Sequence, residues 1–355
     1  MKLAIFMPQF SGGGAEKIMI MFANYLVDLQ GCSVTIVVAN DRGPYKSLVD
    51  SRIRIHALNH NKVFFAVFDL YRFLRQENFE FVYSTLMKAN LISIVACLFL
   101  PTKAIIREAN TLKEARRKAV KLSVKFSLFL SQYLYKYAFK CIAISNHVQK
   151  DLVEFTNCNL KDIEVIYNPI FIVDNIEHPQ LNLREFNVCF VSRLTVQKNI
   201  TTICEVIEYF LKNNLEVHFH FFGDGDEKEK LLLLKQNYNT PLITLHGFNV
   251  SYYSYMKHMN LFVHIPHWEG LGNSVLEAYN SGIPMILSDI SSGYSELISK
   301  EASNVHFVKP VHDVQKIILL ISSYMNNSST AQQNRPKLNM SKEDIFASYL
   351  NLTAN

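Results

Sequence analysis

The sequence has few cysteines, and their spacing excludes a disulfide or zinc framework. The six cysteines are scattered, with no CxxC pair and no histidine at zinc-ligand spacing, and most lie inside apolar runs. Isolated thiols of this kind are typical of reduced core residues in a reducing compartment. We therefore expect a protein without a cysteine-based scaffold.

Long hydrophobic runs are also missing. The apolar stretch Leu91–Leu100, which contains Ser93, is about half of the roughly 20 residues that cross a bilayer. At the N-terminus, the short apolar run Leu3–Met7 meets a glycine cluster before it could become a signal-peptide core. We expect no membrane span and a cytoplasmic location, which includes the inner face of the cell membrane.

What is present is ample apolar material for two domains. The chain has 355 residues, of which 49% are hydrophobic and 19% are charged. Single cores stop growing near roughly 250 residues, so a chain of this length favours two globular domains.

Strand-like runs alternate with helix-length patterns along the whole chain, which favours parallel sheets covered on both faces. The expected strands of the first half are Leu3–Met7, Ser33–Ala39, Phe79–Ser84, Ala104–Arg107 and Cys141–Ile144. Those of the second half are Asn187–Val191, His218–Phe222, Ile243–Leu245, Leu261–Ile265 and Met285–Ser288. We predict two doubly wound α/β domains, 1–175 and 176–338, joined near the proline-containing connector Asn168–Pro179.

The remaining residues, 339–355, read as a helix with Ser341 at its N-cap that packs back toward the N-terminal domain. Ligands of open α/β sheets bind beyond the carboxyl ends of the strands. Function is therefore expected at strand ends, in a cleft between the two domains.

The most informative segment is His267–Ala278, which follows an expected strand and opens a helix. Glu269 stands in a glycine-rich turn, and Glu277 stands one to two turns into the helix, so both can face one cleft. The free amides and partial positive charge of the helix N-terminus between them suit a diphosphate. As isolated residues, both glutamates would be interpreted as solvated, but the return to a buried strand at Met285–Ser288 favours a ligand-binding unit.

Two basic residues, Arg193 and Lys198, follow the expected strand Asn187–Val191. A guanidinium and an ammonium at one strand end can hold a diphosphate and neutralise charge on a nucleotide leaving group. A solvated loop is the alternative.

Two glycine-containing segments follow other strands. Phe222–Asp226 contains Gly223 but lacks the third glycine of a dinucleotide fingerprint, and Asp224 and Asp226 are expected to cap a helix, so we infer neither NAD nor a metal. After the first strand, Gly12, Gly13 and Gly14 precede a helix, which favours a binding loop over a plain flexible turn.

Together these segments resemble the retaining GT-B glycosyltransferases of family 4, over nearly the whole chain. The matching features are the glycine loop with Ala15 and Glu16, Ile144–Ser145, Val165–Pro169, Ser192–Leu194 with Lys198 and Asn199, Gly223–Gly225, and the two glutamates separated by seven residues.

The resemblance implies that Arg193 and Lys198 bind the donor diphosphate and that Glu277 holds the ribose. Glu269, with the amides of Gly270, Leu271, Gly272 and Asn273, would contact the sugar and the phosphate. Transfer would retain the anomeric configuration without a metal or another cofactor, with a UDP-linked sugar as the donor. Many relatives carry a histidine in the loop that matches Ile106–Asn110, where this chain has Ala109; Arg107 and Asn110 are the N-domain candidates that remain.

A basic, apolar segment lies between Lys113 and Lys140. From Lys103 to Lys140 there are ten Lys or Arg against two acidic residues, Glu108 and Glu114. A basic amphipathic helix can lie on an anionic membrane, which favours a lipid-linked glycan acceptor; a helix packed on the sheet with a solvated lysine face is the alternative. We expect no nucleic-acid partner. A sugar-nucleotide epimerase and a non-catalytic sugar-nucleotide-binding relative remain open.

Overall fold

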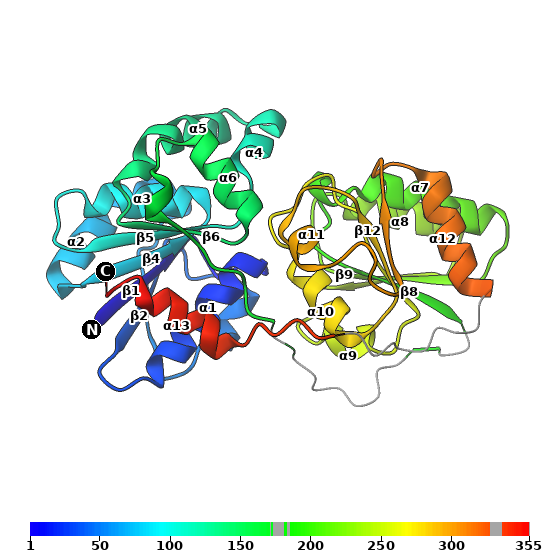
Figure 1. The fold of residues 1–355 in the computed structure, drawn as a ribbon, viewed down its shortest axis with the longest axis horizontal. Coiled ribbons are helices and arrows are strands. Elements are labelled where there is room, and N and C mark those ends of the chain that lie inside the picture. The colour runs from blue at the N-terminus through cyan, green and yellow to red at the C-terminus, as the bar shows by residue number, and fades with distance from the viewer. Residues whose placement is uncertain (171, 173–180, 183–184, 327–335, 355) are drawn as a thin grey trace. The chain divides into compact units, whose positions relative to one another are not determined.

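The computed structural model describes residues 1–170, 172, 181–182, 185–326 and 336–354. The chain divides into two compact units, of which the first comprises Met1–Pro169 with Met340–Asn355 and the second comprises Ile170–Asn339. The first segment of the first unit ends at Pro169, whereas the sequence placed this boundary at 175, which lies outside the described residues. Figure 1 shows the fold of both units.

The first unit is a seven-stranded parallel sheet with helices on both faces (Figure 1). Its strands are β1 (Lys2–Met7), β2 (Ser33–Val38), β3 (Arg54–Ala57), β4 (Phe81–Thr85), β5 (Lys103–Glu108), β6 (Lys140–Ala143) and β7 (Ile163–Val165), in the order β3-β2-β1-β4-β5-β6-β7. Its α-helices are α1 (Gly14–Val27), α2 (Val67–Glu77), α3 (Met87–Cys97), α4 (Leu112–Lys118), α5 (Leu122–Leu134), α6 (Asn146–Phe155) and α13 (Lys342–Asn351). Four 3-10 turns, η1 (Pro44–Leu48), η2 (Val63–Ala66), η3 (Tyr135–Tyr137) and η4 (Leu160–Asp162), complete it.

The second unit repeats the pattern with six parallel strands. They are β8 (Phe186–Val191), β9 (Val217–Phe222), β10 (Ile243–Gly247), β11 (Leu261–His264), β12 (Met285–Ser288) and β13 (Val305–Val308), in the order β10-β9-β8-β11-β12-β13. The helices are α7 (Ile200–Lys212), α8 (Lys228–Asn237), α9 (Tyr252–Met256), α10 (Asn273–Ser281), α11 (Gly293–Leu297) and α12 (Val314–Asn326), with the 3-10 turn η5 (Val196–Lys198). In both sheets the first strand of the unit lies beside the fourth, so the strand order reverses there, and such reversals are where α/β sheets bind ligands.

The predicted α/β fold and all ten predicted strands are confirmed, but three further strands were not predicted from the sequence. β3, β7 and β13 have three or four residues each and carry polar or exposed residues such as Arg54, Glu164 and His306. Each pairs with its neighbour in parallel, and β3, β7 and β13 are edge strands of their sheets. An edge position allows exposure, which removes the continuous apolar run that marks a central parallel strand.

Helix α13 belongs to the first unit, although the second unit separates it from the rest in sequence. Ser341 caps it, because the Ser341 hydroxyl accepts a hydrogen bond from the Asp344 amide at 3.1 Å. Phe346 and Tyr349 of this helix are fully buried against Phe22 and Tyr83, with ring centroids 5.0 to 6.4 Å apart within the cluster. The Tyr83 hydroxyl donates to the Tyr349 carbonyl at 2.7 Å, which fixes the helix against β4.

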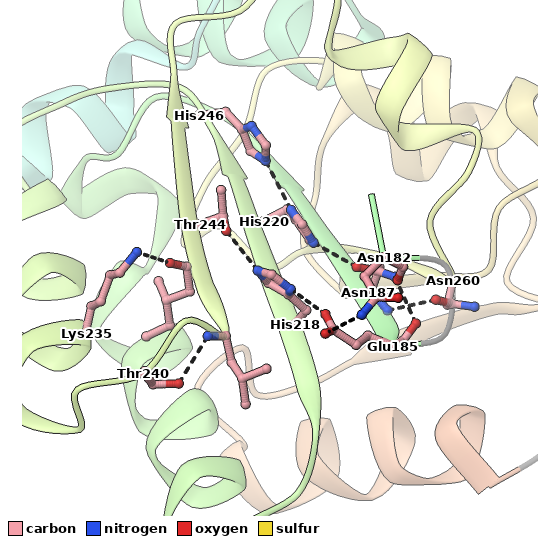
Figure 2. A network of polar contacts seen from close by, with 12 residues as sticks. Asn182, Glu185, Asn187, His218, His220, Lys235, Thr240, Thr244, His246 and Asn260 are labelled. Carbon is pink, nitrogen blue, oxygen red and sulfur yellow. Dashed lines mark hydrogen bonds and ion pairs between the residues drawn. The ribbon is translucent and has the colours of Figure 1, made fainter. Parts of the chain in front are cut away.

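The two faces of the second sheet differ in chemistry. One face carries Phe219 and Phe221 of β9 and packs against α7, α8 and α12 as a continuous apolar core. On the other face, His218 and His220 of β9 and His246 of β10 stack in a row (Figure 2).

Hydrogen bonds link these imidazoles to their surroundings. His218 lies 2.7 Å from Glu185 and 2.8 Å from Thr244, while His220 lies 2.8 Å from Asn187 and 3.1 Å from His246 (Figure 2). Burial lowers the pKa of His220 to about 3 and that of His246 to about 4, with the neighbouring imidazoles adding to the effect in both cases. Both rings are therefore neutral at neutral pH.

Candidate functional site

Two loops that follow neighbouring strands of the second unit form the candidate site. The first follows β8 and carries Arg193 and Lys198, and the second follows β11 and carries Glu269. Two hydrogen bonds hold the loops together, because the Gln197 side chain donates to the Trp268 carbonyl at 2.9 Å and the His267 amide donates to the Gln197 carbonyl at 2.9 Å. The basic and acidic groups that the sequence placed at separate strand ends thus lie at one switch point of the sheet.

Lys198 and Glu269 form an ion pair in a nearly dry environment, with side chains that are 13% and 10% exposed. The His264 Nε2 atom lies 3.1 Å from Glu269 Oε2, the carboxylate oxygen that also contacts Lys198. Burial would raise the pKa of Glu269, but the Lys198 charge and the His264 hydrogen bond outweigh burial and hold this pKa well below its usual range. Glu269 is therefore an ionised, acceptor-only group.

His264 itself is uncharged at neutral pH. Burial first, and then the Lys198 charge, lower its pKa below the ordinary value of 6.5, although Glu269 opposes this shift. Because ionised Glu269 can only accept, a neutral His264 donates through Nε2–H. The three side chains together carry no net charge.

Helix α10 begins beside this cluster, after a turn that requires glycine. Gly272 is the N-cap residue and has a φ of +78°, a left-handed conformation in which a Cβ would approach Tyr294 within 3.0 Å. The predicted contact residues Gly270 and Leu271 are buried in this turn, and the Gly270 amide lies 3.3 Å from Glu269 Oε1. The half-buried Asn273 opens the helix, and a helix N-terminus suits an anion.

The second glutamate, Glu277, lies in α10 and is 4% exposed. The hydroxyl of Tyr252, the first residue of α9, donates a hydrogen bond to Glu277 Oε2. Glu277 is thus a fixed, hydrogen-bonded carboxylate, not the solvated surface residue of the alternative interpretation.

Gly223 allows the loop after β9 to pack against the loop that carries Arg193. It has a φ of +139°, and a Cβ there would lie 1.9 Å from the Ser192 carbonyl oxygen. The Leu194 amide also donates to the Asp224 carbonyl at 2.9 Å, which extends this contact. Gly223 therefore shapes the site through backbone packing. The Arg193 side chain is exposed and forms no ion pair with any described residue.

The expectation that Asp224 and Asp226 cap α8 is wrong. The N-cap residue is Glu227, and within the described segment 223–228 no side chain makes the cap hydrogen bond. Asp224 instead accepts from the Gly225 amide at 2.8 Å and pairs with Lys228 at 3.3 Å, since the helix starts later than the sequence suggested.

In the first unit, the glycine loop leads directly into α1. Gly13 is the N-cap residue with an extended φ of −92°, and Gly12 and Gly14 flank it on the surface side, half-buried and exposed. A Cβ on Gly13 would meet the buried Glu16 carboxylate at 2.5 Å. The close approach that the glycines permit is thus observed with Glu16, and their contact with a donor stays a prediction.

Arg107 is a buried candidate that has several hydrogen-bond partners inside the first unit. Its side chain is 1% exposed and donates to the Tyr349 hydroxyl at 2.9 Å, the Thr85 hydroxyl at 3.1 Å and the Asn168 side-chain oxygen. These internal hydrogen bonds fix β5 to α13, and a contact of Arg107 with a donor stays a prediction. Asn110 is half-buried in the same loop, and its role stays a prediction.

Next to Arg107, Glu108 is a buried carboxyl at the end of β5. Burial raises its pKa to about 7, although hydrogen bonds from the Tyr135 hydroxyl at 2.8 Å and from the Ala109 amide at 3.1 Å oppose the shift. In the sequence, this loop drew attention because it lacks a histidine, and Glu108 was not among the candidate site residues.

Sequence reasoning also missed His264 and Tyr252, and it gave Asn199 only as part of the family resemblance. Asn199 has a left-handed φ of 60° and donates to the Ile265 carbonyl at 3.2 Å, which connects the end of η5 to the end of β11. The position of His264 at a strand end, five residues before Glu269, was a usable signal. Tyr252 gave none, because its contact with Glu277 arises only in the folded unit.

Comparisons with known proteins agree with this geometry. Residues 12–172 match the family described as Glycosyltransferase Family 4, and residues 173–339 match the family described as Glycosyl transferases group 1. The two matches adjoin near the boundary between the structural units.

Among curated relatives, an Escherichia coli UDP-Gal:alpha-D-GlcNAc-diphosphoundecaprenol alpha-1,3-galactosyltransferase is 24% identical, over 79% of this chain and 77% of its own length. A Campylobacter jejuni N-acetylgalactosamine-N,N'-diacetylbacillosaminyl-diphospho-undecaprenol 4-alpha-N-acetylgalactosaminyltransferase is also 24% identical, over 84% of both chains.

Among solved structures, Anabaena Alr3699/HepE in complex with UDP and glucose superposes over 100% of both chains with a TM-score of 0.80 and 16% identity, a likeness that shows the fold. The family matches, the relatives and the paired parallel sheets lead to one conclusion: the chain belongs to the GT-B glycosyltransferases of family 4 and is a hexosyltransferase.

Proposed function

We propose that the protein transfers a hexose or N-acetylhexosamine from a UDP-sugar to a hydroxyl of a lipid-linked glycan during surface polysaccharide biosynthesis. The observation that carries the proposal is the Lys198–Glu269 pair at the switch point of the second sheet, beside the N-terminus of α10. The names of the Escherichia coli and Campylobacter jejuni relatives, which both specify diphosphoundecaprenol-linked acceptors, support the acceptor class.

In this proposal, the exposed Arg193 and the ammonium of Lys198 bind the donor diphosphate. The bond from the anomeric carbon to the phosphate oxygen breaks, the acceptor oxygen bonds to that carbon on the same face, and the hydroxyl proton passes to the departing UDP. The two cations and the amides of α10 stabilise the negative charge that builds on UDP. Glu269 orients the sugar hydroxyls and Glu277 holds the ribose, so positioning and electrostatics supply the catalysis and no metal is required.

A turnover assay tests the proposal. Purified protein is incubated with a panel of UDP- and GDP-sugars, with and without a membrane extract, and products are identified by mass spectrometry and by nuclear magnetic resonance of the anomeric proton. We expect acceptor-dependent release of UDP and an α-linked product, both retained in EDTA and lost in Glu277→Ala.

Other outcomes would contradict the proposal in distinct ways. A free altered sugar would indicate the epimerase, binding without turnover would indicate the non-catalytic relative, and activity abolished by EDTA would contradict metal independence. A β-linked product from an α-linked donor would exclude retention.

We further propose that the first unit rests on an anionic membrane through α5 and its basic flanks. Leu122, Phe126, Phe129 and Tyr133 recur at helical spacing on α5 and are all 51% to 81% exposed, whereas Ser127 and Ser131 face inward. Leu128 faces inward as well, so α5 packs on the first unit through one face and presents this apolar stripe on the other. Lys118, Lys121 and Lys125 are exposed beside the apolar stripe, which suits anionic lipid head groups.

The structure contains no helix, among the residues it describes, whose length and apolarity would let it cross a bilayer. Membrane contact would therefore be peripheral, and vesicle co-sedimentation measures it. We expect binding to phosphatidylglycerol vesicles that weakens with salt and drops about tenfold or more in a Phe126→Ser/Phe129→Ser variant, given roughly 1.5–3 kcal/mol per buried aromatic.

Leu319→Ser is the matched control, because Leu319 is a 69% exposed apolar residue on α12 of the second unit. Equal vesicle binding by wild type and the double variant would refute the membrane contact without affecting the transferase assignment.

A further inference from the structure

We propose that His264 is a positioning residue for Glu269, which holds the carboxylate in place and keeps it ionised when a donor diphosphate competes for Lys198. The inference rests on the proposed function and deepens it, because it assigns a role to a side chain that the transfer scheme does not use.

The local fold brings His264 to the carboxylate. His264 is the last residue of β11, and the chain turns back within five residues so that Glu269 Oε2 lies 3.1 Å from His264 Nε2. Both side chains are buried, 4% and 10% exposed, and Tyr294 of α11 packs edge-on against the imidazole with ring centroids 6.1 Å apart. The imidazole therefore has little freedom to leave the carboxylate.

The charges around Glu269 make the second partner necessary. The titratable groups that act on it from the described elements are Lys198 of η5 and His264 of β11, and Tyr294 of α11 is close enough to respond to its charge. A diphosphate bound at Lys198 brings two new negative charges, which compete with Glu269 for the Lys198 ammonium. A buried carboxylate that loses its counter-ion tends to take up a proton and would then no longer be an acceptor-only group for the sugar hydroxyls.

A hydrogen bond to the charged form of a carboxyl favours that form, even when the donor is neutral. His264 supplies this bond from the strand side, so it remains in place when the Lys198 side chain moves toward a ligand. The pairing of a mobile cation with a fixed donor separates two tasks: Lys198 binds the diphosphate, and His264 positions the carboxylate.

Three substitutions distinguish hydrogen bonding from simple packing. His264→Gln keeps a side-chain N–H near the position of Nε2, His264→Asn is equally polar but too short to reach Glu269, and His264→Leu is apolar. His306→Asn is the control, because His306 is an exposed histidine of β13 in the same sheet. Circular dichroism establishes whether each variant is folded. If His264→Leu is unfolded, the comparison of His264→Gln with His264→Asn still tests the hydrogen bond.

Two measurements follow, of which one does not need turnover. The first is the pH dependence of kcat/KM for the UDP-sugar. The second is the side-chain carboxyl 13C signal of Glu269 in UDP-saturated protein, assigned by its loss in Glu269→Gln.

We expect His264→Asn and His264→Leu to move the acid limb of the kcat/KM profile and the titration of the Glu269 carboxyl upward by about one pH unit. In both variants kcat should fall by a larger factor than the donor KM changes. His264→Gln should stay close to wild type in both. Equal titration in all variants, or a Gln variant that behaves like Asn, would overturn the positioning role. Absence of transfer by the wild type with every donor would refute the proposed function, whereas the carboxyl titration would still decide the role of His264.

Discussion

A single buried carboxylate, Glu269, connects the residues that the site depends on. Its negative charge is balanced by Lys198, and both side chains are largely withdrawn from water. Removing one member of a buried pair strands the other charge in a medium of low polarity, whereas removing both charges leaves a neutral interior. Stability and activity should therefore respond differently to single and double substitution.

We expect Lys198→Met to destabilise the second unit by about 3–5 kcal/mol, because Glu269 loses its cation while it remains buried. The Lys198→Met/Glu269→Gln variant should recover most of that stability and remain inactive. The chain has one tryptophan, and it is Trp268 beside the pair, so urea unfolding followed by its fluorescence reports on this unit. Additive destabilisation in the double variant would show that the two charges do not depend on each other.

The sequence indicated the charged residues of the candidate site, but not the residues that hold them in place. Arg193, Lys198 and Glu269 could be selected because they follow strands, and Glu277 because it lies in the helix that comes next; the structure gathers Lys198 and Glu269 into one ion pair. His264 and Tyr252, which fix the two glutamates, act through contacts between different elements, and no local spacing encodes such contacts. The internal partner of Arg107 could not be predicted for the same reason, since Tyr349 lies 242 residues away.

Among the elements, α13 has the clearest consequence for the stability of the first unit. Its Tyr349 hydroxyl accepts a hydrogen bond from Arg107 Nε at the end of β5, and Arg107 also donates to Asn168, the residue before the end of the first segment of this unit. The arginine thus joins β5 both to α13 and to the last residues of the Met1–Pro169 segment.

Tyr349→Phe removes this acceptor and leaves part of a buried guanidinium without a partner. We expect a loss of about 1.5–3 kcal/mol in the first unit, the usual range for hydrogen bonds to charged groups. Hydrogen–deuterium exchange of β5 and α13 peptides should rise, while unfolding measured by Trp268 in the second unit stays unchanged. Tyr137→Phe, at a 55% exposed tyrosine of η3, is the control, and equal exchange in both variants would contradict this role.

Prediction of the helices succeeded where the hydrophobic period and the N-cap residue agreed, and it failed where packing against a neighbouring loop sets the start of the helix. The helix after Ser341 was found because serine at an N-cap precedes a helical run, and Ser341 makes the cap hydrogen bond. At α8, two aspartates resembled caps, but the Gly223 and Gly225 backbone packs against the neighbouring loop and the helix starts only at Lys228. Tertiary packing overrode a local signal there.

At the scale of the whole molecule, the two units should differ in their response to acid. The second unit contains the histidine row of Figure 2, in which His220 and His246 have pKa values of about 3 and 4 in the folded state. Unfolded histidine has a pKa near 6.5, so the unfolded chain binds protons that the folded unit excludes. This contribution is complete above about pH 6.5 and is lost as the pH falls toward the folded values.

We therefore expect the free energy of unfolding of the second unit, measured by Trp268 fluorescence, to decline as the pH falls below about 6.5. A shift of one pKa unit corresponds to roughly 1.4 kcal/mol, so His220→Gln should flatten this decline even if it lowers stability at neutral pH. His258→Gln, at an exposed histidine that follows α9, serves as the control. An unchanged slope in His220→Gln would show that other groups cause the acid sensitivity.

The return of α13 to the first unit also determines the order in which the protein can be completed on the ribosome. The sheet of the first unit is synthesised first, yet Phe22 and Tyr83 receive the Phe346 and Tyr349 rings only after all of Ile170–Asn339 has been translated. The second unit is continuous in sequence and can close on its own core during that interval. The nascent chain therefore carries an uncovered aromatic surface on its earlier half while its later half is already native, and chaperones that recognise such surfaces would act on the first unit.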